Sequence, residues 1–342
     1  MTEKPGEPGS LYDIALRWHR ANPRAPLPDD AEPDGGCGFV RRGKGSPPGV
    51  AAAEALDRHF ADPAATPADL DHAVHLAADA QVHGNAHVTA AAERADPGRA
   101  HETGRWLVRH SGHLCGVNTG IVLLGTARDP ADIPLIRTVG LYSDGCAALA
   151  VATLSRIRNG HDAILWLAER LTGWGRSYAV GALCRRAGTY RDWLLRSACP
   201  DVLDGYYAGE VATAAHLHAA VTAPVVDDEL LDHTGMLLRT MSGCHGMGMT
   251  LTGYPPAAEV LRHYLRHVAE RPPTVGRYVV LADLWRRGAS GRAVDLAVID
   301  PALPGMVRDV LDRPEWWETY RQARDEGDTH AEWLATTGWR GP

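Results

Sequence analysis

Apolar residues recur along most of the chain with the 3.6-residue period of amphipathic α-helices. Near the start, Leu11, Ile14 and Ala15 fall on one face of a predicted helix that Ser10 can cap. A second helix is predicted over residues 50–62. The chain therefore begins with two predicted helices of ordinary amphipathic character.

From residue 63 onwards, the sequence predicts one helix after another, each about 10–15 residues long and ended by Gly, Pro or Asn-Gly. No segment alternates apolar and polar residues for long enough to form a sheet. The chain is therefore predicted to be all-α. The predicted helices span residues 68–81, 99–110, 113–124, 131–141, 143–158, 162–171, 174–187, 190–199, 209–222, 228–241, 256–270, 274–288, 302–311 and 315–326.

The predicted helices form pairs that recur about every thirty residues, since Ala131, Asp162 and Tyr190 each open a helix of a pair. The segment GTARDPADIPLIR at residues 125–137 is echoed by AGTYRDWLLR at residues 187–196. One pair alone leaves a face of each helix uncovered, whereas stacked pairs bury a continuous core and leave one curved concave face. This spacing predicts a helical repeat array.

These phrases resemble the HEAT-repeat family, especially its short bacterial form. In that family a D-x-x-x-x-P-L-I phrase opens the first helix of a repeat, as DPADIPLI does at residues 129–136. The partner helix of the family carries R-x-x-A-x-x-A-L, which WGRSYAVGAL approaches at residues 174–183. The resemblance covers residues 103–199 and implies a right-handed α-solenoid of stacked antiparallel helix pairs.

Residues 22–49 differ from the rest because they are rich in Pro, Gly and Asp. Such a segment holds too few apolar residues to fix it on a core, so we expect an irregular, mobile arm. The sequence thus divides into an N-terminal helix with a Pro/Gly-rich arm, residues 1–62, and a helical repeat domain, residues 63–342.

Composition narrows the protein class. The 342 residues carry a formal net charge of −7, and the only lysines are Lys4 and Lys44, so nucleic acid is not the expected partner. High Ala, Arg, Gly and Pro with little Lys is typical of GC-rich, actinobacterial-type genomes. No apolar run has the length of a membrane span, and no signal peptide is recognisable. We therefore expect a cytoplasmic protein that does not enter a membrane.

The cysteines lack any C-x-x-C pair, which excludes zinc-ribbon and thioredoxin-type motifs. Without a secretion signal they are expected to be free thiols, and Cys146 and Cys184 are predicted to be buried in second helices of repeats. The six positions are Cys37, Cys115, Cys146, Cys184, Cys199 and Cys244.

Two patterns approach known binding motifs without completing them. Residues 38–45 nearly spell a phosphate-binding loop, but Gly45 stands where Ser or Thr holds the magnesium ion. Histidine pairs at helical spacing could place two imidazoles on one face, but 17 histidines produce such pairs by chance. The pairs are His72/His75, His83/His87 and His263/His267. We therefore expect no metal site and no cofactor.

The segment from residue 206 to residue 245 is the strongest candidate for a ligand site, because the repeats become irregular after Cys199. Its aromatic and titratable side chains could line a pocket, and its histidines are suited to proton transfer near neutral pH. Cys244 beside His245 could carry a thiolate if a partner histidine approached from elsewhere, and tight interhelical packing is the competing interpretation. The candidate residues are Tyr206, Tyr207, Glu210, His216, Asp232, His233, Cys244 and His245.

Three functions remain open from the sequence. The first is a curved helical-repeat protein that binds a protein partner or a ligand on its concave face, without chemistry of its own. The second is a small-molecule enzyme of actinobacterial specialised metabolism, with its pocket in the C-terminal repeats. The third is a HEAT-like DNA glycosylase, which surface-facing Trp174 and Arg176, together with Trp193, would suit and the negative net charge opposes. Whether the chain is an enzyme is left undecided.

Overall fold

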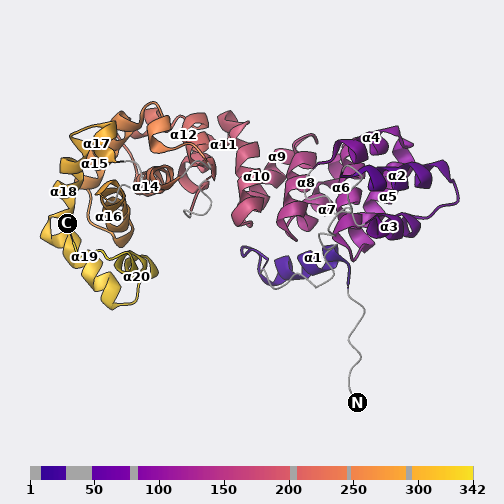
Figure 1. Ribbon diagram of the computed structural model, residues 1–342, viewed down its shortest axis with the longest axis horizontal. Coiled ribbons are helices and arrows are strands. Elements are labelled where there is room, and N and C mark those ends of the chain that lie inside the picture. The colour runs from indigo at the N-terminus through magenta and orange to yellow at the C-terminus, as the bar shows by residue number, and fades with distance from the viewer. Residues whose placement is uncertain are drawn as a thin grey trace, which may run out of the picture. The chain divides into compact units, whose positions relative to one another are not determined.

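A computed structural model describes residues 9–27, 48–77, 84–200, 206–244, 248–289 and 295–341. Within these residues the chain forms helices and no strand, which confirms the all-α prediction (Figure 1). The chain divides into two compact units, Met1–Ala182 and Leu183–Pro342. None of the described helices is long and apolar enough to cross a membrane.

The N-terminal unit is built from ten helices and a 3₁₀ turn within the described residues, the last helix ending just past its boundary. They are α1 (Leu11–Ala21), α2 (Val50–Ala61), α3 (Pro67–Leu76), α4 (Ala86–Arg94), α5 (Pro97–His110), α6 (Leu114–Ala127), the 3₁₀ turn η2 (Pro130–Asp132), α7 (Ile133–Val139), α8 (Asp144–Leu154), α9 (Gly160–Ala168) and α10 (Gly173–Cys184).

The described part of the C-terminal unit holds the remaining helices. They are α11 (Ala187–Ser197), α12 (Ala208–Ala214), α13 (Leu217–Val221), α14 (Asp228–Gly243), the 3₁₀ turn η4 (Leu251–Gly253), α15 (Ala257–Ala269), α16 (Val275–Ala289), α17 (Leu296–Ile299), α18 (Leu303–Leu311), α19 (Pro314–Asp325) and α20 (Thr329–Thr336).

Local sequence explains many of the helix starts. The Ser10 hydroxyl accepts a hydrogen bond from the backbone N–H of Asp13, and Leu11 and Ala15 are buried, as the apolar stripe predicts. Asp227 caps α14 in the same way through the N–H of Leu230. Such capping satisfies N–H groups that the first turn of a helix leaves unpaired.

Helices that follow one another in sequence pack together in the N-terminal unit. Helix α5 contacts α6 and α7, α6 contacts α8, and α7 contacts α8 and α9. Helix α1 packs against α5 and α7, and α2 packs against α3 and α4. Contacts between near neighbours in sequence therefore make up much of the core of this unit. The division of the chain at residue 62 stays a prediction.

The structure differs from the predicted elements in two respects. Residues 209–222 form two helices, α12 and α13, because His216 adopts a left-handed backbone with φ of 54°. Helices α4, α17 and α20 were not predicted, although Asn85 and Asp328 cap the first and last of them. Most of the arm at 22–49, together with the loop at 38–45, lies outside the described residues.

The cysteines mostly behave as predicted. Cys146 and Cys184 are buried free thiols, as expected, and Cys199 and Cys244 are also free. Burial raises the pKa of Cys184 to about 12, so its thiol stays protonated at neutral pH. The expectation of a free thiol is wrong for Cys115, which is disulfide-bonded. Cys37 lies outside the described residues.

His59 is an unusual member of the core that α2 shares with neighbouring helices. It is buried, its ring contacts Phe60 edge-on, and neither ring nitrogen has a hydrogen-bond partner among the described residues. Burial lowers the pKa of His59, and the positive charge of Arg99 lowers it further. The folded chain therefore holds this imidazole in its neutral form.

We expect His59 to make the protein less stable as the pH falls below about 6.5, the ordinary histidine pKa. There the unfolded chain binds a proton that the folded chain does not, so the stability present above this pH is lost below it. His59→Leu should remove this loss and add about 1–2 kcal/mol at pH 5.5, because it also removes unpaired buried nitrogens. Urea denaturation at pH 7.5 and 5.5 measures both effects. His72→Leu, at an exposed position of α3, is the control and should leave the pH dependence unchanged.

Candidate functional site

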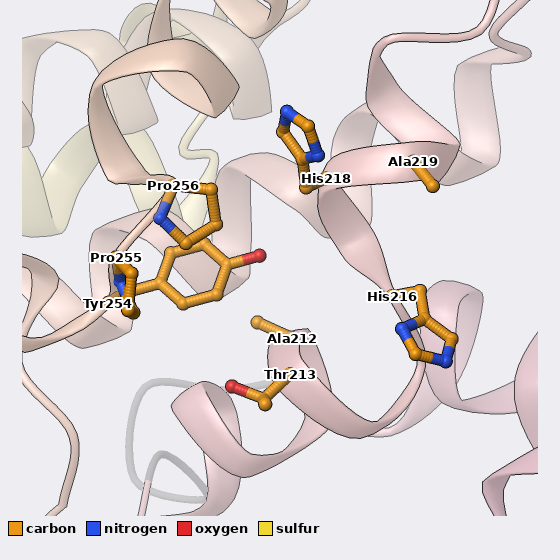
Figure 2. A pocket seen from close by; sticks show the side chains of 8 residues that line it. All are labelled: Ala212, Thr213, His216, His218, Ala219, Tyr254, Pro255 and Pro256. Atoms are coloured by element: carbon orange, nitrogen blue, oxygen red, sulfur yellow. The ribbon is translucent and has the colours of Figure 1, made fainter.

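A pocket of about 250 Å³ lies in the C-terminal unit, where α12 and α13 meet the segment that leads into α15 (Figure 2). The left-handed turn at His216 breaks the helix and lets the two short helices take different directions around the pocket. Its lining is mostly apolar and includes two histidines, a tyrosine and a threonine. The lining residues are Ala212, Thr213, His216, His218, Ala219, Tyr254, Pro255 and Pro256.

Tyr254 supplies the most deeply buried polar group of the pocket. The residue is 4% exposed, and its hydroxyl points into the space between α12 and α13 (Figure 2). Burial raises the pKa of Tyr254, and a hydrogen bond with the backbone of His218 opposes that rise. The hydroxyl is therefore neutral at physiological pH and fixed in direction.

The other polar groups lie toward the rim. His216 is exposed, whereas His218 is half-buried and its Nε2 lies 2.8 Å from an Oε2 oxygen of Glu259. The hydroxyl of Thr213 donates to the carbonyl of Gly209 in the preceding turn, at 2.8 Å. The pocket thus offers an apolar floor with hydrogen-bonding groups at one side, an arrangement that suits the binding of a small molecule.

Of the predicted ligand-site residues, His216 is the one that the structure places in this pocket. Tyr206 and Tyr207 precede α12 and are half-buried, and Glu210 is exposed in the first turn of that helix. Partial desolvation raises the pKa of the Glu210 carboxyl group. These residues thus lie on or beside the helix that carries Ala212 and Thr213.

Cys244 ends α14 close to Tyr206. A Cβ atom placed on Gly248 would lie 3.0 Å from the Sγ of Cys244 and 2.9 Å from the carbonyl oxygen of Tyr206, so the three residues meet. Burial raises the pKa of the Cys244 thiol, which disfavours the thiolate that nucleophilic chemistry needs. His245 lies outside the described residues.

Asp232 and His233 are engaged elsewhere. The carboxylate of Asp232 accepts a hydrogen bond from the Nε of Arg277, at 2.6 Å. His233 is buried against α11, where its Nδ1 lies 2.7 Å from the carbonyl oxygen of Leu195 and its Nε2 accepts the N–H of Cys199 at 3.0 Å. Since a carbonyl only accepts, Nδ1 carries the proton, and the two ring nitrogens hold the backbone at the end of α11 and just beyond it.

The side chains that suggested DNA binding are placed differently from one another. Trp174 is 45% exposed and stacks near Tyr178, whereas Arg176, expected at the surface, is buried and donates to the carbonyl of Ala168. A guanidinium held by a backbone carbonyl in the interior is not positioned for a phosphate. Trp193 is half-buried on α11.

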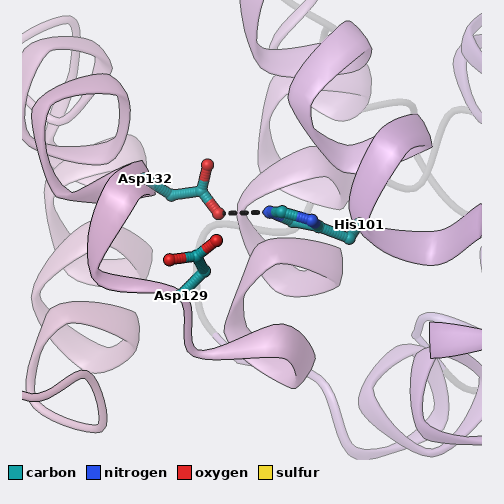
Figure 3. Close-up of side chains that lie close together, drawn as sticks. All are labelled: His101, Asp129 and Asp132. Atoms are coloured by element: carbon teal, nitrogen blue, oxygen red, sulfur yellow. Dashed lines mark hydrogen bonds and ion pairs between the residues drawn. The ribbon is translucent and has the colours of Figure 1, made fainter. Parts of the chain in front are cut away.

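A second group of polar side chains meets in the N-terminal unit (Figure 3). One ligand atom from each of His101, Asp129 and Asp132 lies within 4.8 Å of the others. His101 comes from α5, while Asp129 directly precedes the turn η2 and Asp132 is its last residue. The Nε2 of His101 lies 2.6 Å from an oxygen of Asp132, and a second helix residue, Arg105, lies 3.5 Å from the other oxygen.

Three histidines of the pairs noted in the sequence make contacts with other residues. His75 stacks on His113 with ring centroids 3.8 Å apart. His263 accepts a hydrogen bond from Arg266, and His267 donates to the carbonyl of Val221. His83 lies outside the described residues.

Comparison with protein-family models, with curated proteins and with solved structures finds no match to this chain. The resemblance to HEAT repeats therefore rests on the phrases in the sequence, and function has to be argued from the side chains themselves. Among the described residues, two places have side chains arranged so that they could bind a ligand or an ion: the pocket at Tyr254 and the group at His101.

Proposed function

We propose that this chain is a HEAT-like helical-repeat protein that binds a small ligand without performing covalent chemistry on it. The contacts of the N-terminal unit support the repeat arrangement. In an array of stacked pairs, each helix contacts its partner, and equivalent helices of successive pairs contact each other. If α5/α6 and α7/α8 are two such pairs, the contacts α5–α6 and α7–α8 are those within pairs, and the contacts α5–α7 and α6–α8 are those that stacking requires.

The pocket beside Tyr254 is the single observation that carries the binding function. Its volume of about 250 Å³ lies just below the range of about 300–1,000 Å³ that holds drug-sized ligands, so we infer a smaller, fragment-sized ligand. The apolar floor favours a ring or short aliphatic group. The Tyr254 hydroxyl and the two imidazoles favour a hydrogen-bonding group at one end of that ligand.

The candidate catalytic residues support binding over catalysis. Both nitrogens of His233 hold backbone groups, and Asp232 pairs with Arg277. The Cys244 thiol has a raised pKa, and the Tyr254 hydroxyl does too. A pocket whose buried tyrosine hydroxyl stays protonated is organised to hold a molecule rather than to transfer a proton at neutral pH.

Ligand-observed NMR with a library of molecules of at most about fifteen non-hydrogen atoms tests this proposal. Ala219→Phe should fill the pocket and weaken the fragments that bind there by about tenfold or more, a loss of about 1.4 kcal/mol. The matched control, Ala297→Phe, adds the same ring at an exposed position of α17 and should change nothing. The proposal fails if no fragment separates the two variants while both remain folded by circular dichroism.

A further inference from the structure

We propose that His101, Asp129 and Asp132 form a binding site for a divalent transition-metal ion in the N-terminal unit. One imidazole nitrogen and two carboxylate oxygens are ligands that Mn²⁺, Fe²⁺, Co²⁺ and Zn²⁺ accept. The three side chains come from two segments of the fold, α5 and residues 129–132 at the turn η2, and α7 contacts both α5 and η2. The site is distinct from the pocket at Tyr254 and does not depend on it.

The burial of Asp132 is the first reason. Its side chain is 0% exposed, and among the described residues its Oδ1 accepts no hydrogen bond. A buried carboxylate needs partners for both oxygens, because desolvation otherwise disfavours its charge. The guanidinium of Arg105 lies 3.5 Å from this Oδ1 oxygen and is partly exposed. A metal ion would give this carboxylate the partner that it lacks.

The approach of the three ligand atoms is the second reason. Two ligands of one metal, each about 2.0–2.2 Å from the ion, lie at most about 4.4 Å apart. The observed limit of 4.8 Å therefore requires only a small closing movement. Asp129 can supply it, because it is half-buried at the edge of the group, and Figure 3 shows one of its oxygens beside the His101–Asp132 hydrogen bond.

The third reason is the charge of the group. The two carboxylates outnumber the single guanidinium, so a divalent ion is favoured electrostatically. One oxygen of Asp129 accepts the N–H of Ala131 at 2.9 Å, which leaves the second oxygen to face the ion. The Nε2 of His101 and one oxygen of Asp132 already lie 2.6 Å apart, so these two ligand atoms face the same point.

The competing explanation is that the hydrogen bond between His101 and Asp132 only holds α5 against η2. A variant of Asp129 distinguishes this explanation from a metal site. Asp129 takes no part in the hydrogen bond between His101 and Asp132. Asp129→Asn keeps a side-chain oxygen for the N–H of Ala131 and removes only the negative charge. The hydrogen bond between His101 and Asp132 should remain after this change, whereas metal binding should be weakened.

Titration of the whole chain with Co²⁺, followed by its visible ligand-field absorption, tests the proposal. We expect the chain to bind one equivalent of Co²⁺, with an absorption that saturates. Asp129→Asn should weaken it by about tenfold or more, and His101→Gln should abolish it. His72→Gln, which removes an exposed histidine of α3, is the matched control and should leave the spectrum unchanged.

Circular dichroism of each variant, recorded without metal, shows that it remains folded. If His101→Gln loses its fold, the comparison of Asp129→Asn with the parent chain still decides the question. The proposal is overturned if Co²⁺ gives no saturable spectrum. It is also overturned if the spectrum and its midpoint are the same in Asp129→Asn as in the parent chain.

Discussion

Replacing Asp283 by alanine is expected to lower the free energy of unfolding of the protein by about 3–5 kcal/mol. Asp283 lies on α16 and is 0% exposed. One of its oxygens accepts the Nε–H of Arg239 from α14, and the other accepts an N–H of Arg286, each at 2.8 Å. The Arg239 guanidinium is itself buried, 4.4 Å from the ring centroid of Trp333 on α20.

The cost arises because the substitution removes one partner and leaves the other charge in place. Arg286 is partly exposed and can turn toward water, but Arg239 is held among three helices. A buried cation without its counter-ion has lost its hydration, and no ion pair replaces it. The double variant Asp283→Leu with Arg239→Met removes both charges and should regain most of the lost stability.

Urea denaturation followed by circular dichroism measures these effects. Asp312→Ala is the matched control. Asp312, the residue after α18, pairs with Arg308 of that helix at 3.2 Å, and both side chains are exposed. That surface pair should contribute less than about 0.5 kcal/mol. A loss below about 1 kcal/mol in Asp283→Ala would contradict a buried ionic network, and a double variant as unstable as the single one would assign the loss to packing.

Much of the fold was predictable because helices are specified by local sequence. The start of α1 is predicted by Ser10 and the apolar stripe that follows it, and the start of α14 by Asp227. The same local evidence existed for α4 and α20, whose caps are Asn85 and Asp328. Their short length and weak apolar pattern kept the caps from being recognised as helix starts.

The break at His216 could not be predicted in the same way. Residues 209–222 contain no Gly or Pro between the two short helices, and a left-handed backbone at a histidine is uncommon. Helix α12 packs against α14, and α13 packs against α14 and α15, all contacts with segments outside residues 209–222. Tertiary packing therefore overrides a sequence that reads as one continuous helix.

The candidate sites were only partly predictable for a related reason. His216 and Tyr254 line one pocket although nearly forty residues separate them, and His101 and Asp132 meet although they are 31 positions apart in sequence. No spacing rule links such residues, because the stacking of helices decides which faces meet. Sequence analysis could name His216 from its chemistry, but it had no means of finding its partners.

His233 shows how a residue chosen for its chemistry can serve the fold instead. We expect His233→Ala to lower the free energy of unfolding by about 3–4 kcal/mol, because the change removes two buried hydrogen bonds and leaves a cavity. The residue is 6% exposed, and its ring joins α14 to the end of α11 through Leu195 and Cys199.

A conservative variant separates hydrogen bonding from packing. His233→Asn can still place an N–H near the carbonyl of Leu195, as Nδ1 does, and should recover part of the lost stability. His72→Ala, at an exposed position, should cost less than about 0.5 kcal/mol. Thermal and urea denaturation of the three variants give the order of stability expected from these contacts.

The decisive comparison is between stability and binding. His233 faces α11, whereas the fragment pocket is lined by α12, α13 and the residues before α15, so His233→Asn should bind pocket fragments with unchanged affinity. A supporting residue changes the amount of folded protein but leaves the intrinsic affinity of that protein alone. If His233→Asn remained folded and lost fragment binding that His72→Ala retained, His233 would belong to the ligand site after all.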